Sequence, residues 1–131
     1  MDPMILSLLV ASAPTPSSCR GGAPVIASAV SRVGKNDGGV NTYVVHVVVV
    51  NHGGTQKSNV LQSVAVYQNG DKVNEKGIPP LRAGASYAFD QTLQRSDESH
   101  SDATSLRFQV HAVANATGAC YGGGAAYRLS V

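Results

Sequence analysis

The chain has 131 residues, enough for one domain with a hydrophobic core and too few for two ordinary ones. Its net charge is only +2, and no two of its 10 lysines and arginines are adjacent. Nucleic-acid binding relies on clustered positive charge and stacking rings, yet aromatic residues make up 5% of the chain and tryptophan is absent. We therefore expect no nucleic-acid partner. The 14 glycines and 43% hydrophobic content are typical of an all-β domain with many turns.

Residues 1–13 have the pattern of a secretory signal peptide. An apolar run over residues 4–13 ends in Ala11-Ser12-Ala13, the small-residue pattern of a cleavage site. The run is shorter than the 20 or so apolar residues that span a bilayer, so we expect no transmembrane segment. The lack of a positive charge before the run and Pro14 after it are atypical of a signal peptide. The alternative is an apolar N-terminus that is packed or disordered. A signal peptide predicts export to the periplasm, the cell surface or the medium.

The globular domain is expected over residues 24–131. Residues 14–23 before it are a linker by composition, rich in proline, serine and glycine. A first strand is expected over residues 25–33, followed by a turn at 34–39. The stretch 40–54 comes next and contains eight valines and tyrosines, residue types that favour extended backbone.

The stretch 40–54 predicts the central strand of the domain. Its alternate residues form two apolar faces, so we expect both faces to be covered, or nearly so. The first face would contain Tyr43, Val45, Val47 and Val49, and the second Val44, His46, Val48 and Val50. The apolar character of the second face leaves open a homo-oligomer.

Five more strands follow, each bounded by turn residues. The pair Asn69-Gly70 is the strongest hairpin signal in the chain. Residues 106–112 alternate between apolar and polar side chains without exception. The expected strands cover residues 60–68, 71–76, 86–94, 106–112 and 127–131. About seven short strands at this spacing predict an immunoglobulin-like antiparallel β-sandwich.

A valine strand ends in Asn-x-Gly (48–53), a later strand runs into Asn-Gly (64–70), and a Leu-x-x-Gly step follows at 81–84. These three segments resemble the bacterial cell-adhesion-related domains, the CARDB group. The resemblance covers roughly residues 25–113. It implies an immunoglobulin-like module that acts as a spacer or a binding platform on a bacterial surface protein.

Cys19 and Cys120 are the only cysteines. In an exported chain an even pair suggests a disulfide. Cys19 precedes the first expected strand and Cys120 precedes the last, and these strands lie near each other in many sandwiches. The alternative is two free thiols in flexible segments.

The tetrapeptide Ile78, Pro79, Pro80 and Leu81 is apolar and stiff. One interpretation is an anchor that enters a groove on a partner. The other is a connection between sheets whose Ile78 and Leu81 pack inward.

The segment 97–102 has three carboxylates and a histidine: Asp97, Glu98, His100 and Asp102. Their oxygens would suit calcium, but the segment lacks the alternating ligand spacing and the turn glycine of a calcium loop. A solvated loop that contacts a partner is the better interpretation. An enzyme would use His100 with Asp97 or Asp102, but no known catalytic motif is present. We expect no metal and no cofactor.

The function favoured by these patterns is an exported, non-catalytic binding or structural module. It would contact a protein or glycan partner through its loops or an edge strand. The alternative is a periplasmic inhibitor or chaperone-like factor that presents residues 77–84. An enzyme is a remote third hypothesis.

Overall fold

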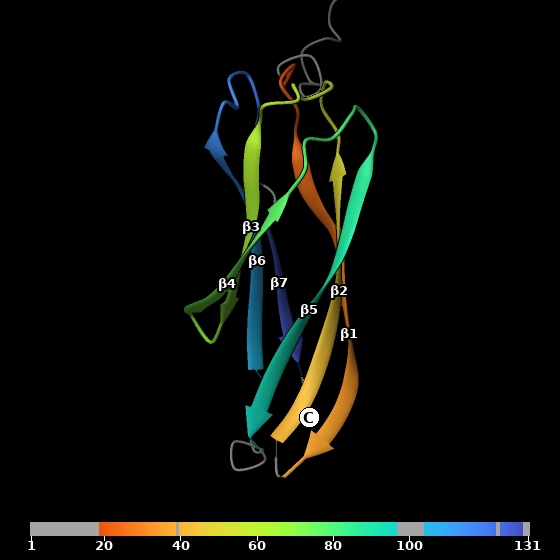
Figure 1. The fold of residues 1–131 in the computed structure, drawn as a ribbon, viewed down its shortest axis with the longest axis vertical. Coiled ribbons are helices and arrows are strands. Elements are labelled where there is room, and N and C mark those ends of the chain that lie inside the picture. The colour runs from red at the N-terminus through yellow and green to blue at the C-terminus, as the bar shows by residue number, and fades with distance from the viewer. Residues whose placement is uncertain (1–18, 39, 97–103, 123, 130–131) are drawn as a thin grey trace, which may run out of the picture.

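The computed structural model describes residues 19–38, 40–96, 104–122 and 124–129. Seven strands pack as two antiparallel sheets, and the described residues contain no helix (Figure 1). One sheet has the order β1-β2-β5 and the other β4-β3-β6-β7. The strands are β1 (Pro24–Asp37), β2 (Val40–Asn51), β3 (Leu61–Gln68), β4 (Asp71–Ile78), β5 (Ser86–Ser96), β6 (Thr104–Ala114) and β7 (Gly124–Leu129). The predicted all-β sandwich of about seven strands is therefore confirmed.

The strand order differs in one respect from that of constant-type immunoglobulin domains. There the fourth strand pairs with the fifth. Here β4 pairs with β3, from Gln62 opposite Ile78 to Gln68 opposite Asp71. This pairing extends the second sheet to four strands and leaves the first with three.

Strand β2 is the centre of the three-stranded sheet, between β1 and β5. One face of β2 lies in the core, where Tyr43, Val45, Val47 and Val49 are at most 2% exposed. On the opposite face His46 is exposed and its valine neighbours are half-buried. The expectation that both faces would be covered, or nearly so, therefore holds for the inner face, whereas the outer face is only partly covered. A two-layer sandwich offers each sheet only one partner sheet, so the outer face is shielded only by neighbouring side chains.

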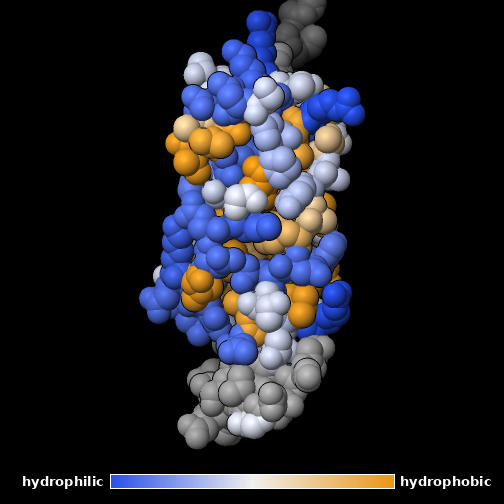
Figure 2. Space-filling model, viewed as in Figure 1, coloured by the Kyte–Doolittle hydropathy of each residue, from blue (hydrophilic) through white to orange (hydrophobic). Residues whose placement is uncertain are grey.

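The second sheet completes the core with the apolar faces of β3 and β6. Buried and exposed residues alternate along the start of β6, as its sequence predicts, and Leu106, Phe108 and Val110 are at most 2% exposed. Val64 and Val66 of β3 are fully buried beside them. On the face seen in Figure 2, hydrophobic side chains occur as small separate groups on a largely hydrophilic surface.

The hairpin predicted at Asn69-Gly70 joins β3 to β4. Both residues have positive φ, 51° and 89°, as a type I′ turn requires. Strand β4 is an edge strand, and its residues 71–75 are all exposed. Charged side chains on such an edge oppose pairing with another chain.

The described residues do not test the prediction for the N-terminus. Residues 1–13, expected to be a signal peptide, lie outside them, and so do 14–18 of the expected linker. The last strand begins earlier than expected, at Gly124, because Gly124 already pairs with Gln109 of β6.

Candidate functional site

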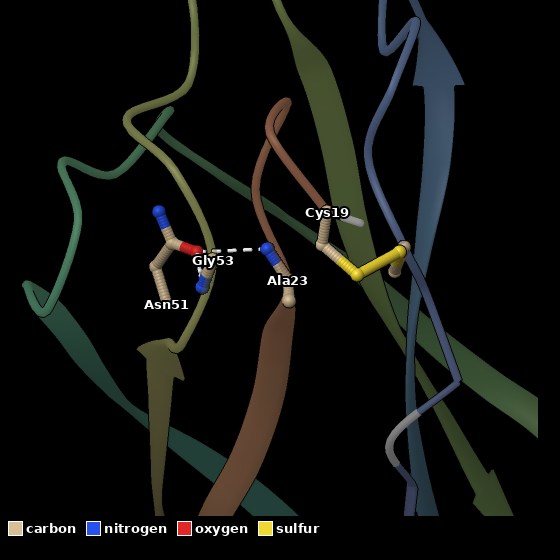
Figure 3. The surroundings of a disulfide bond; sticks show 5 residues. Cys19, Ala23, Asn51 and Gly53 are labelled. Carbon is tan, nitrogen blue, oxygen red and sulfur yellow. Dashed lines mark hydrogen bonds between the residues drawn. A yellow bond between two sulfur atoms is a disulfide. The ribbon is translucent and has the colours of Figure 1, made fainter. Parts of the chain in front are cut away.

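Four segments meet at one end of the sandwich, and we call this the disulfide end. They are residues 19–23, 52–60, 79–85 and 115–122. The bond between Cys19 and Cys120 joins the first segment to the last across 101 residues, with the Cα atoms 5.5 Å apart (Figure 3). The predicted disulfide is thus present.

Backbone hydrogen bonds reinforce the disulfide on both sides. The amide of Gly21 donates to the carbonyl of Gly118 at 2.9 Å, and the amide of Cys120 donates to the carbonyl of Gly22 at 2.8 Å. Farther along the sandwich, the amide of Ser31 in β1 donates to the hydroxyl of Tyr127 in β7. The first and last strands therefore lie close enough for the cysteines before them to meet.

Asn51, the last residue of β2, connects three of the four segments. Its side chain is fully buried. The Oδ1 atom accepts hydrogen bonds from the amides of Ala23 at 2.8 Å and Gly53 at 2.9 Å (Figure 3). The Nδ2 atom donates to the carbonyls of Gly54 and Leu81, both at 2.9 Å. One amide group thus replaces the backbone partners that these loops cannot find in a strand.

A buried pair of side-chain amides, Gln56 and Gln62, shares the backbone of Leu81 with Asn51. The side chains of Gln56 and Gln62 donate to each other, with both N···O distances 2.8 Å. Gln56 also accepts from the amide of Leu81, and Gln62 donates to the carbonyl of Pro79. The hydroxyl of Tyr121 donates to Gln62 at 2.6 Å. Burial raises the pKa of Tyr121, and its hydrogen bond with Gln56 opposes that rise.

Glycines allow the first two segments to touch. A Cβ atom on Gly54 would lie 2.2 Å from the carbonyl oxygen of Arg20, and one on Gly53 would lie 2.6 Å from that of Cys19. Both contacts are with backbone, which cannot swing away. The pair Gly53-Gly54 is therefore a packing requirement of this end as well as a strand terminator.

A hollow of about 190 Å³ opens between the segments 19–23, 52–60 and 115–122. Its lining contains two cationic side chains, those of Arg20 and Lys57, and no carboxylate. Neither cation forms an ion pair with a described residue. The described residues that line the hollow are Arg20, Gly21, Thr55, Lys57, Asn59, Val60, Asn115 and Thr117.

The tetrapeptide proposed as a partner anchor has its apolar ends in the core. Ile78 is 6% exposed and Leu81 5%, whereas Pro79 is exposed and Pro80 partly so. The backbone of Leu81 is also held by Gln56 and Asn51. These positions are those of the inward-packing alternative. An open, mainly apolar groove of about 420 Å³ lies beside it, with Leu61 and Val113 more than half exposed on its rim.

The other site residues predicted from the sequence, Asp97, Glu98, His100 and Asp102, lie outside the described residues. Two other histidines are paired with carboxylates on opposite sheets. His46 Nδ1 is 2.8 Å from Asp90, and His111 Nε2 is 3.0 Å from Glu75. Across the described ranges, no three His, Cys, Asp or Glu side chains gather as metal ligands would.

Glu75 is the centre of a polar cluster on the outer face of the second sheet. Its carboxylate accepts from Lys72 and lies beside His111 and Ser63. The hydrogen bond from Lys72 lowers the pKa of Glu75, and the charge of Lys72 and the nearby His111 add to this effect. Ser63 thus pairs with the carboxylate of Glu75.

Comparisons with known proteins do not assign a function. No family model matches the chain, and no curated protein matches it. Among solved structures, a crystal structure of a protein from Archaeoglobus fulgidus aligns with 79% of this chain and 93% of its own. The sequence identity is 9% and the TM-score 0.35, too low to support an inference. In the described part of the chain, no helix has the length and apolar character needed to cross a membrane.

Proposed function

We propose that this protein is an exported, non-catalytic binding module that contacts a protein or glycan partner through the loops of its disulfide end. The observation that carries the proposal is the construction of that end. Four loop segments are fixed by one disulfide and by the buried amides of Asn51, Gln56 and Gln62. The sequence resemblance to the CARDB group supports the same kind of module.

Rigid loops suit binding because they lower the conformational entropy lost when a partner docks. A sandwich that served only as a spacer would have no need of a fixed loop surface. The side chains of Arg20 and Lys57, unpaired within the described residues, give this surface polar groups that a partner can use.

Two features support export. Disulfides persist in oxidising compartments and are rare in the cytosol. The bond from Cys19 to Cys120 is the one pairing that this chain can form, because it has only two cysteines. The apolar run over residues 4–13, with its small-residue ending, supports a secretory signal before the domain.

The intact mass of the protein, measured in each cell fraction of its native host, tests export. We expect a species that begins near residue 14, lies outside the cytoplasm and gains the mass of two hydrogens on reduction. A full-length cytoplasmic species with free thiols would contradict the proposal.

Binding is tested with the same purified, oxidised protein. Labelled protein should bind to cell envelopes isolated from the host, and unlabelled protein should compete for the same sites. A matched sample with the disulfide reduced and alkylated should bind less, because the loops at that end lose their covalent tie. Equal binding by both samples, or none by either, would count against a role for these loops.

A further inference from the structure

The hollow at the disulfide end has the chemistry of an anion site, and its ligand class follows from the lining. We propose that it binds an acidic sugar, a carboxylate- or sulfate-bearing residue of a surface polysaccharide. This inference rests on the proposed binding function and names the ligand of the same end.

Charge is distributed unequally along the molecule. The four segments of the disulfide end contain Arg20, Lys57 and Arg82 and not one aspartate or glutamate. The acidic side chains with described surroundings lie on strands, at Asp71 and Glu75 of β4 and at Asp90 of β5. Within these four segments the positive potential is therefore not offset, and it attracts an anionic ligand.

The lining supplies donors for both parts of an acidic sugar. Arg20 and Lys57 offer charge-assisted hydrogen bonds to an oxyanion. Asn59, Thr55 and Thr117 offer amide and hydroxyl groups suited to sugar hydroxyls. The side-chain nitrogen Nδ2 of Asn115 donates to the carbonyl of Asn59 at 3.0 Å, which holds the Asn115 side chain in place.

The size and apolar content of the hollow argue for a sugar rather than a peptide or a nucleic acid. At about 190 Å³ it is smaller than the pockets of roughly 300–1,000 Å³ that hold drug-sized ligands. Val60 is its one large apolar lining residue, so a hydrophobic peptide anchor has little to contact. The lining has no aromatic ring on which a base could stack.

The walls of the hollow are fixed in place. A Cβ atom on Gly21 would lie 2.5 Å from the carbonyl oxygen of Thr117, so the backbones of two walls are in direct contact. The disulfide and the Gly21–Gly118 hydrogen bond hold the same two walls together. The backbone segments that carry the donors therefore keep their positions without a ligand, which reduces the entropic cost of binding.

Isothermal titration calorimetry at low salt tests the proposal. The probes are hexagalacturonate, which carries carboxylates, a heparin hexasaccharide, which carries sulfates, the neutral maltohexaose, and inorganic phosphate. We expect at least one acidic hexasaccharide to bind, more weakly as salt is added, and maltohexaose not to bind. Failure of both acidic hexasaccharides would overturn the proposal, and so would phosphate binding as tightly as they do, which would indicate a free-anion site.

Three variants locate the site. The double variant Arg20→Gln with Lys57→Gln should weaken binding at least about tenfold, because it removes both charged donors. Asn59→Asp should also weaken it, since it places a carboxylate on an exposed position of the lining. The control Arg128→Gln lowers the net charge by one unit on β7, as Asn59→Asp does in the lining, and it should stay within about twofold of the unsubstituted protein. Equal weakening by Arg128→Gln would overturn the proposal by showing non-specific charge attraction.

Thermal unfolding of each variant shows whether the fold is intact, and Asn59→Asp remains a test if the double variant does not fold. The two proposals fail in different ways. Envelope binding that survives the double variant would remove the sugar site and leave the binding module. If the protein is cytoplasmic and reduced but still binds acidic sugars through Arg20 and Lys57, the exported module is refuted and the sugar site remains.

Discussion

Replacing Asn51 with alanine tests whether one buried side chain holds the disulfide end together. The Asn51 side chain is fully buried and forms four hydrogen bonds of 2.8–2.9 Å with the backbone of three loop segments. Alanine keeps the strand but removes both the acceptor and the donor. The carbonyls and amides that Asn51 satisfies then lose their partner in a buried position.

The expected loss follows from the hydrogen bonds. At about 1 kcal/mol net for each, the four bonds amount to about 4 kcal/mol. Buried backbone groups left without partners increase the cost, whereas water that enters the space of the lost amide decreases it. We expect the free energy of unfolding to fall by about 3–5 kcal/mol, which for a domain of this size lowers the melting temperature by about 12–20 °C.

Urea denaturation followed by circular dichroism measures this loss. Tyrosine fluorescence is a second probe, since the chain has five tyrosines and no tryptophan. The matched control is Asn59→Ala, an exposed position in the same loop region, which should change stability by less than about 0.5 kcal/mol. A loss below about 1 kcal/mol for Asn51→Ala would refute the role assigned to its side chain.

Three further predictions concern the disulfide and two titrating groups. Serine at both Cys19 and Cys120 should lower the free energy of unfolding by roughly 4–5 kcal/mol, the chain-entropy value for a loop of this length, and urea midpoints showing less than about 1 kcal/mol would contradict it. Because the pKa of Tyr121 is raised in the folded state, both states keep the proton below pH about 10 and stability falls as pH rises through the folded pKa. Tyr121→Phe should remove part of that alkaline loss, and an unchanged pH profile of unfolding would count against it. The pKa of Glu75, measured by NMR, should lie below its usual value and rise toward that value in Lys72→Met. A pKa in Lys72→Met equal to that of the unsubstituted protein would exclude Lys72 as the main cause.

Local sequence patterns predicted the elements whose cause is itself local. The period-two alternation of β6 and the Asn69-Gly70 turn are determined by neighbouring residues, and both appear as expected. The covering of β2, in contrast, depends on how strands distant in sequence are ordered. The face of β2 that contains His46 was expected to be covered because valine alone does not distinguish a buried position from a half-buried one.

The candidate site likewise has one feature that the sequence predicted and one that it did not. The disulfide was predictable because two cysteines allow only one pairing within the chain. The role of Asn51 was not, since the polar run that follows it looks like a solvated connection. Two of the partners of Asn51 are distant in sequence, Ala23 at 28 residues before it and Leu81 at 30 residues after it. A contact of that range leaves no local signal beyond a polar residue at the end of a valine strand.

The buried amides show which part of this molecule has its geometry fixed by side chains. Apolar residues in place of Gln56 and Gln62 would leave the amide of Leu81 and the carbonyl of Pro79 without their partners, which costs stability. What an amide pair adds is direction, because each donor and acceptor fixes the position of a specific backbone atom. Asn51, Gln56 and Gln62 are three of the five buried polar residues identified among the described ones, and all three hold the disulfide end. The side chains that fix loop positions are thus concentrated at the end that contains the hollow, where fixed loops would lower the entropy lost when a ligand binds.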